Sequence, residues 1–188
     1  MVMKKIRVLC FSFILASQAS VASAQLVVIG KGHAAQCFEY AKSANQGTRS
    51  ATETCTEALN QPQTQKDRAA THVNRGILIM RKENYNDAIK DFNAALEINP
   101  NLTEAHVNMA AALIYQDKLE PALTSINTAL QDVESETRPA ALLNRAVIYD
   151  RQEKYLLAYR DLKAAAVLKP DWEKVDTFLS RYTVIQKS

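Results

Sequence analysis

The sequence predicts an all-α protein built from stacked pairs of antiparallel helices. Two stretches carry this prediction: NYNDAIKDFNAALEINP at residues 84–100 and KYLLAYRDLKAAAVLKP at residues 154–170. In both, small and bulky apolar residues recur at helical spacing, and a proline closes the stretch, at Pro100 and Pro170. Proline ends a helix because it lacks a backbone N–H donor and restricts the residue before it. Because the pattern recurs at a fixed interval, the helix pairs are expected to stack as an alpha-solenoid.

Three units align with one another, and they start at Ala69, Thr103 and Pro139, which are 34 and 36 residues apart. Counted from these starts, positions 8, 20 and 27 hold small residues, while positions 17 and 24 hold bulky ones. Small residues let two helix backbones approach, and bulky residues fill the space left between them. The five positions are Gly76, Tyr85, Ala88, Phe92 and Ala95; then Ala110, Leu119, Ala122, Ile126 and Ala129; then Ala146, Tyr155, Ala158, Leu162 and Ala165.

This pattern closely resembles the tetratricopeptide repeat (TPR), which ends with a proline at position 32. The resemblance covers Ala69 to about Trp172. The middle unit departs from the pattern, because Glu134 replaces the closing proline and Pro121 stands at position 19, where a first helical turn tolerates it. The resemblance implies two antiparallel helices per unit and a concave surface formed by the first helix of each unit.

The first residues have the three parts of a secretory signal peptide. A basic stretch, residues 1–7, precedes a short apolar run at residues 8–16, and Ala22-Ser23-Ala24 offers a small-residue cleavage site. The run is too short to span a bilayer comfortably, although an uncleaved N-terminal anchor is the alternative. We expect cleavage after Ala24, no membrane insertion afterwards, and a periplasmic or secreted protein.

Cleavage also changes the charge balance of the chain. Removal of Lys4, Lys5 and Arg7 takes the 23 basic residues to 20, which equals the number of acidic ones. A neutral chain lacks the sustained basic face that nucleic acid requires, so we expect no nucleic-acid partner.

Two cysteines remain after cleavage, Cys37 and Cys55. The segments around them resemble short helices, and the turn-like stretch at residues 43–47 lies midway between them. Two helices that fold back about this turn bring the cysteines opposite one another. In an oxidising compartment we expect a disulfide worth about 3 kcal/mol, with a pair of buried thiols as the alternative.

The last residues are expected to form a capping helix, because Asp171 suits an N-cap and apolar residues follow at helical spacing. These apolar residues are Trp172, Val175, Phe178, Leu179, Tyr182 and Ile185. The expected organisation is a signal peptide at 1–24, an extended segment at 25–33, a Cys-containing hairpin and loop at 34–68, repeats at 69–102, 103–138 and 139–172, and the cap at 173–188.

The sequence offers no chemistry typical of an enzyme. It holds no phosphate-binding loop, no nucleophile elbow and no metalloprotease motif, and four glycines leave little material for a phosphate cradle. His72 and His106 both stand at position 4, and we interpret them as packing residues, since no second ligand is spaced for a metal. We expect no enzyme, no cofactor and no metal site.

Binding is the function that the repeats favour. Asparagine stands at position 6 of every unit, as Asn74, Asn108 and Asn144, on the face turned toward the concave surface. An amide both donates and accepts hydrogen bonds, so three of them at one-repeat spacing match the backbone of an extended peptide. The arrangement resembles the asparagine ladder of O-linked N-acetylglucosamine transferase, although asparagine is frequent at this position in TPRs generally.

The residues around the asparagines are apolar, and we expect them to line an exposed groove that binds a peptide or protein segment. They include Val73, Ile77, Val107, Ala111, Tyr115, Leu143 and Val147. The alternative is an assembly subunit whose groove is filled by its own segment at residues 25–30, or by self-association into a homo-oligomer.

Two pairs of opposite charges are predicted to join the helices of a unit. Position 7 and position 23 hold Arg75 and Asp91 in the first unit. In the third unit they hold Arg145 and Asp161. In the middle unit both partners are absent together, replaced by Met109 and Ser125, and this joint loss favours contact between them.

Overall fold

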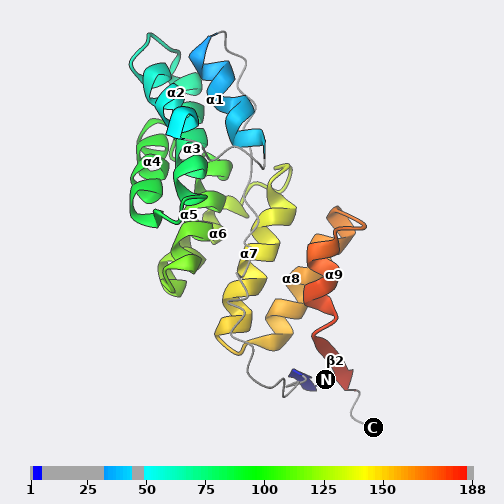
Figure 1. Cartoon of the computed structure of the whole chain (residues 1–188). Coiled ribbons are helices and arrows are strands. Elements are labelled where there is room, and N and C mark those ends of the chain that lie inside the picture. Colours follow the sequence, from blue (N-terminus) through cyan, green and yellow to red (C-terminus); the bar gives the residue numbers. More distant parts are fainter. Residues whose placement is uncertain (1, 6–31, 44–48, 186–188) are drawn as a thin grey trace.

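The computed structural model describes residues 2–5, 32–43 and 49–185. Within them, nine helices and two short strands follow one another along the chain (Figure 1). The elements are β1 (Val2–Lys5), α1 (His33–Lys42), α2 (Arg49–Leu59), α3 (Gln65–Met80), α4 (Tyr85–Ile98), α5 (Thr103–Tyr115), α6 (Leu119–Ala129), α7 (Arg138–Arg151), α8 (Tyr155–Leu168), α9 (Glu173–Leu179) and β2 (Tyr182–Ile185).

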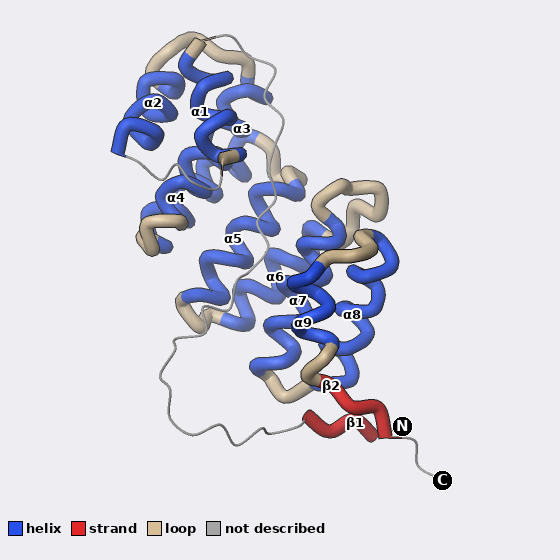
Figure 2. The backbone as a smooth tube through the Cα atoms, turned by 45° about the vertical axis from the view of Figure 1, so that its right-hand side comes forward, coloured by secondary structure: helices blue, strands red, loops and turns tan. Residues whose placement is uncertain are grey.

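The predicted solenoid is confirmed. Helices α3 and α4, α5 and α6, and α7 and α8 form the three pairs, with α1 and α2 at one end of the array and α9 at the other (Figures 1 and 2). Each turn between paired helices contains a residue of positive φ: Glu83, Asp117 and Glu153, all at position 15. No helix among the described residues has the length and apolar character needed to cross a membrane.

The small and bulky residues of the repeat meet inside each pair, as their spacing predicts. Gly76 on α3 lies so close to the Phe92 ring on α4 that a Cβ atom there would be 2.5 Å from Cε1. The other two units use alanine with a smaller partner, and all four of those side chains are buried: Ala110 with Ile126, and Ala146 with Leu162.

The predicted disulfide is present and closes the hairpin of α1 and α2. The sulfurs of Cys37 and Cys55 are 2.04 Å apart, and the Cα atoms are 4.9 Å apart. Ala51 and Ala58 flank Cys55 at the spacing of positions 20, 24 and 27, and both are buried. The disulfide therefore replaces the packing contact between positions 8 and 24, and the hairpin has the pattern of a fourth unit.

Contacts with the neighbouring unit support this assignment. Arg75 donates to Thr56, the residue after Cys55, at 3.1 Å. Arg145 makes the same contact with Asn127, the residue after Ile126, also at 3.1 Å.

The two arginines at position 13 also make equivalent contacts with the preceding unit. Arg81 donates to the carbonyls at the end of α1, including Ser43 at 2.9 Å, and Arg151 donates to the Ile114 carbonyl at the end of α5 at 2.6 Å. Each of these side chains therefore caps the first helix of the preceding unit.

The C-terminal cap is shorter than predicted, because α9 ends at Leu179 and residues 182–185 form β2. Tyrosine, threonine, valine and isoleucine in succession favour an extended backbone, and helical spacing of the apolar residues conceals this preference. β2 pairs antiparallel with β1, which lies in the segment predicted to be cleaved. Residues 6–31, which include the predicted cleavage site and the segment at 25–30, lie outside the described residues.

Candidate functional site

The predicted binding face lies on α3, α5 and α7, but it is not the exposed groove that the sequence suggested. Most of its apolar side chains are fully buried and belong to the main core cluster. Helix α5 packs against both α3 and α7, and a helical-wheel argument for isolated units does not include these contacts. The buried residues are Val73, Ile77, Val107, Ala111, Leu143 and Val147. Tyr115 keeps partial exposure and stacks on Tyr85, with ring centroids 5.0 Å apart.

The three asparagines share complete burial, but they differ in their hydrogen bonds. Asn108 donates to the Glu104 carbonyl one turn earlier, at 2.7 Å. Asn144 donates to the Val107 carbonyl of the preceding unit, at 3.4 Å. In Asn74, both the amide nitrogen and the amide oxygen are buried without a hydrogen-bond partner in the part of the chain that the structure describes.

An unpaired buried amide is unfavourable, because it has lost its hydrogen bonds to water without replacing them. The cost is about 1–3 kcal/mol for each unsatisfied group. A peptide unit has one C=O acceptor and one N–H donor, which are the partners that the N–H and C=O groups of the Asn74 amide need. The Asn74 amide therefore keeps donor and acceptor groups that the described chain does not satisfy.

Both predicted ion pairs are present on the side of these helices that faces the second helix of the unit. Arg75 donates to both oxygens of Asp91, at 2.8 and 2.7 Å. Arg145 donates to both oxygens of Asp161, at 2.7 and 2.9 Å. The hydrogen bond with Asp161 raises the pKa of Arg145. These pairs join helices within a unit and take no part in the candidate binding face.

The histidines at position 4 contribute more than the packing that the sequence suggested. His72 Nδ1 lies 3.0 Å from Asp91, and His106 Nδ1 lies 3.2 Å from Ser125 Oγ, so each contacts position 23 of its own unit. Burial alone would raise the pKa of Asp91, but hydrogen bonds from His72 and Arg75 outweigh it and lower the pKa. Because the third unit has Leu142 at position 4 and still has Asp161 at position 23, comparison of the units does not predict these contacts.

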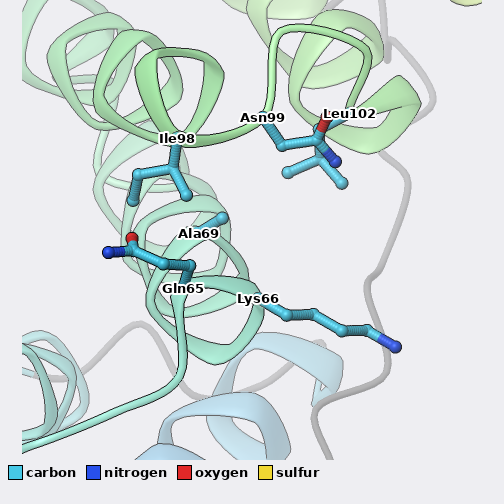
Figure 3. Close-up of a pocket in the computed structure, with 6 residues that line it drawn as sticks. All are labelled: Gln65, Lys66, Ala69, Ile98, Asn99 and Leu102. Carbon is cyan, nitrogen blue, oxygen red and sulfur yellow. The ribbon is translucent and has the colours of Figure 1, made fainter.

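A separate cavity of about 340 Å³ lies where the start of α3 meets the connection from α4 to α5 (Figure 3). None of the predicted binding residues lines it. Its walls are Gln65, Lys66, Ala69, Ile98, Asn99 and Leu102. In the described part of the chain, no three His, Cys, Asp or Glu side chains gather in a way that would hold a metal ion.

Comparison with known proteins identifies the repeat. The family model described as tetratricopeptide repeat matches residues 69–102, which are the first unit. No curated protein matches the chain.

Solved structures share the fold. The TPR domain of OM64 from Arabidopsis has a TM-score of 0.58 at 19% identity, covering 63% of this chain and 96% of that one. YrrB, described as a TPR protein with an unusual peptide-binding site, has a TM-score of 0.57 at 21% identity, covering 69% and 64%. MamA from Desulfovibrio magneticus RS-1, residue 41 to its end, has a TM-score of 0.61 at 17% identity, covering 81% and 84%. The family model therefore identifies the first unit as a tetratricopeptide repeat, and the three helix pairs stack as they do in these structures.

Proposed function

We propose that the chain is an exported, non-enzymatic protein that binds an extended peptide or protein segment along the face of α3, α5 and α7. The TPR fold is typical of protein–protein interaction. Export is supported by the signal-peptide pattern of residues 1–24 and by the disulfide, which is a bond of oxidising compartments.

The single observation that carries the binding proposal is the Asn74 amide, buried with both of its polar atoms unpaired in the described chain. Two unsatisfied groups together are a large fraction of the stability of a small protein, which totals only about 5–15 kcal/mol. A backbone segment at Asn74 would satisfy both groups, and Asn108 and Asn144 continue the same row at one-repeat spacing.

Burial of the face favours a second candidate function. The side chains at positions 5, 6 and 9 are almost inaccessible in all three units, as expected if the groove serves assembly and is filled within the protein. Deletion of residues 25–30 separates the two candidates. A groove filled by that segment gains peptide binding when the segment is deleted, whereas a groove that serves other proteins binds them with or without it.

The proposed function is tested by partner recovery from an extract of the cell envelope. The triple variant Asn74→Ala, Asn108→Ala and Asn144→Ala should lose the bound protein. The matched control is Asn93→Ala, which removes an exposed asparagine on α4. Equal recovery by the triple variant and wild type would rule out binding through the asparagines.

Stability provides the necessary companion measurement. Asn74→Ala should leave the free energy of unfolding unchanged or raise it in the absence of ligand, because alanine is the better helix former and the amide makes no described hydrogen bond. A loss of more than about 1 kcal/mol would show that the amide holds the fold together, as expected for a hydrogen bond made inside the protein.

A further inference from the structure

The strand β2 is held at the end of the array by its first residue. Tyr182 is buried, and its hydroxyl donates to Asp150 on α7 at 2.6 Å. Its ring packs against Tyr155 and Tyr159 on α8, with centroids 6.5 and 6.1 Å away. Burial raises the pKa of Tyr182 and the hydrogen bond to Asp150 raises it further, so the hydroxyl stays a donor. None of these contacts involves β1, so the anchor of β2 at Tyr182 does not depend on β1.

β1 shows what kind of segment pairs with the edge of β2. It is a four-residue extended segment that runs antiparallel to β2, with Val2 opposite Ile185 and Lys5 opposite Tyr182. β1 also contacts α8, so it lies against both the strand and the helix. Pairing of this kind depends mainly on backbone hydrogen bonds, and it therefore tolerates many sequences.

Cleavage after Ala24 would remove β1 and leave this edge open; this step rests on the export proposed above. The edge then presents a row of backbone N–H and C=O groups without a strand beside them. Such an edge pairs readily with another extended segment, and the β-branched residues of β2 favour the extended conformation. The mature chain therefore carries an acceptor strand at its C-terminal end.

The same cleavage places a suitable donor at the new N-terminus. The mature chain would begin with Gln25, followed by Leu26-Val27-Val28-Ile29, which is a run of residues with high strand propensity. The position of α1 limits how far this segment can reach within its own chain. Ile29 lies four residues before His33, the start of α1, and four residues span at most about 14 Å.

The distance that the donor would have to cross is larger. Three steps between packed helix pairs separate α1 from α8, or about 30 Å at the usual spacing of packed helices. Figures 1 and 2 show α1 and β2 at opposite ends of the array. We propose that Leu26–Ile29 of one mature chain adds to β2 of a second copy, in the place that β1 occupies before cleavage.

This contact joins the N-terminal end of one chain to the C-terminal end of the next. A head-to-tail contact is not self-complementary, so it propagates into linear assemblies instead of closing a symmetric dimer. With the register of β1 retained, Leu26 lies opposite Ile185 and Val28 lies opposite Thr183.

The test begins with the mature protein purified from the compartment to which it is exported. Its N-terminal sequence is read first, and its mass is measured by size-exclusion chromatography with light scattering over a range of concentrations. We expect a chain that begins at Gln25 and a mass that rises with concentration to several chains. Deletion of residues 25–30, or Val184→Pro in β2, should return the mass to that of one chain.

A cross-link distinguishes strand addition from other kinds of association. Mature Val28→Cys and mature Thr183→Cys are mixed under mild oxidation and should form an intermolecular disulfide. Val28→Cys mixed with Thr177→Cys, an exposed position on α9, is the control and should not. The Cys37–Cys55 pair is already oxidised and stays out of the reaction.

The outcomes separate this inference from the proposed function. A purified chain that still begins at Met1 overturns the export proposal and this inference with it. A chain that begins at Gln25 but remains monomeric at all concentrations overturns the inference alone. Association that survives deletion of residues 25–30 also overturns it, because the donor strand is then not required.

Discussion

The ion pair between Arg145 and Asp161 provides a prediction in which the two single substitutions differ. The Asp161 side chain is 10% exposed, whereas that of Arg145 is 24% exposed and also donates to Asn127. Arg145→Met therefore leaves a carboxylate that is nearly buried and has lost its cation. Breaking a fully buried pair costs about 3–5 kcal/mol, and partial exposure at this edge reduces that to about 2–3 kcal/mol.

Removing the carboxylate instead of the arginine should cause a smaller loss of stability. Asp161→Ser leaves an arginine that is partly exposed and keeps a hydrogen bond, so we expect a loss of about 1 kcal/mol. The double variant, Arg145→Met with Asp161→Ser, copies positions 7 and 23 of the middle unit, where Met109 and Ser125 stand. It should be more stable than Arg145→Met alone, because no charge is left without its partner.

Urea unfolding followed by circular dichroism measures all four proteins, and an unchanged m-value confirms that the same structure unfolds in each. The reasoning requires a coupling of more than about 1 kcal/mol between the two sites. Additive losses, with the double variant the least stable of the four, would refute it and show that the two residues act as independent surface charges.

Three further predictions concern stability. Gly76→Ala should lower the free energy of unfolding by about 1–3 kcal/mol, because its Cβ would be 2.5 Å from the Phe92 ring. Adding Phe92→Leu copies the alanine–leucine pair of the third unit, and it should restore most of the lost stability in the same unfolding measurement. Replacing Cys37 and Cys55 by serine should remove about 3 kcal/mol from the hairpin, seen as faster hydrogen exchange in α1 and α2 than in the wild type, while α5–α8 stay protected. Because the pKa of Asp91 is lowered in the folded chain, its ionised form stabilises the fold above the unfolded pKa of about 4, and this contribution is lost as pH falls through the lower folded value. The stability gap between wild type and Asp91→Asn should therefore narrow below about pH 4, and a gap that is constant from pH 7 to pH 3 would contradict the assignment.

The features that could be predicted from the sequence are those that recur within each unit. Small residues opposite bulky ones, the proline at a helix end, and the paired loss of position 7 with position 23 all report local contacts between two helices. Comparison of the units with one another therefore located Arg75 and Asp91 as partners. The disulfide followed from the position of two cysteines on either side of a turn.

Comparison of the units does not predict two other kinds of feature: packing between units, and whether a segment forms a helix or a strand. The face around Asn74 is buried, and the contacts of α5 with α3 and α7 are not visible in the pattern of one unit. The helix predicted to continue to residue 188 gives way to β2, because strand-forming residues also fall at helical spacing. The hairpin of α1 and α2 was not recognised as a fourth unit, since cysteines occupy the positions where small and bulky residues mark the others.

The most direct test of the binding proposal is the affinity of the chain for the segment recovered from the cell envelope, measured for wild type and Asn74→Ala. Two hydrogen bonds to the Asn74 amide are worth about 1 kcal/mol each, so the dissociation constant should rise by about tenfold or more. Asn93→Ala should bind as wild type does. An unchanged dissociation constant for Asn74→Ala would contradict the proposal that this amide holds a peptide.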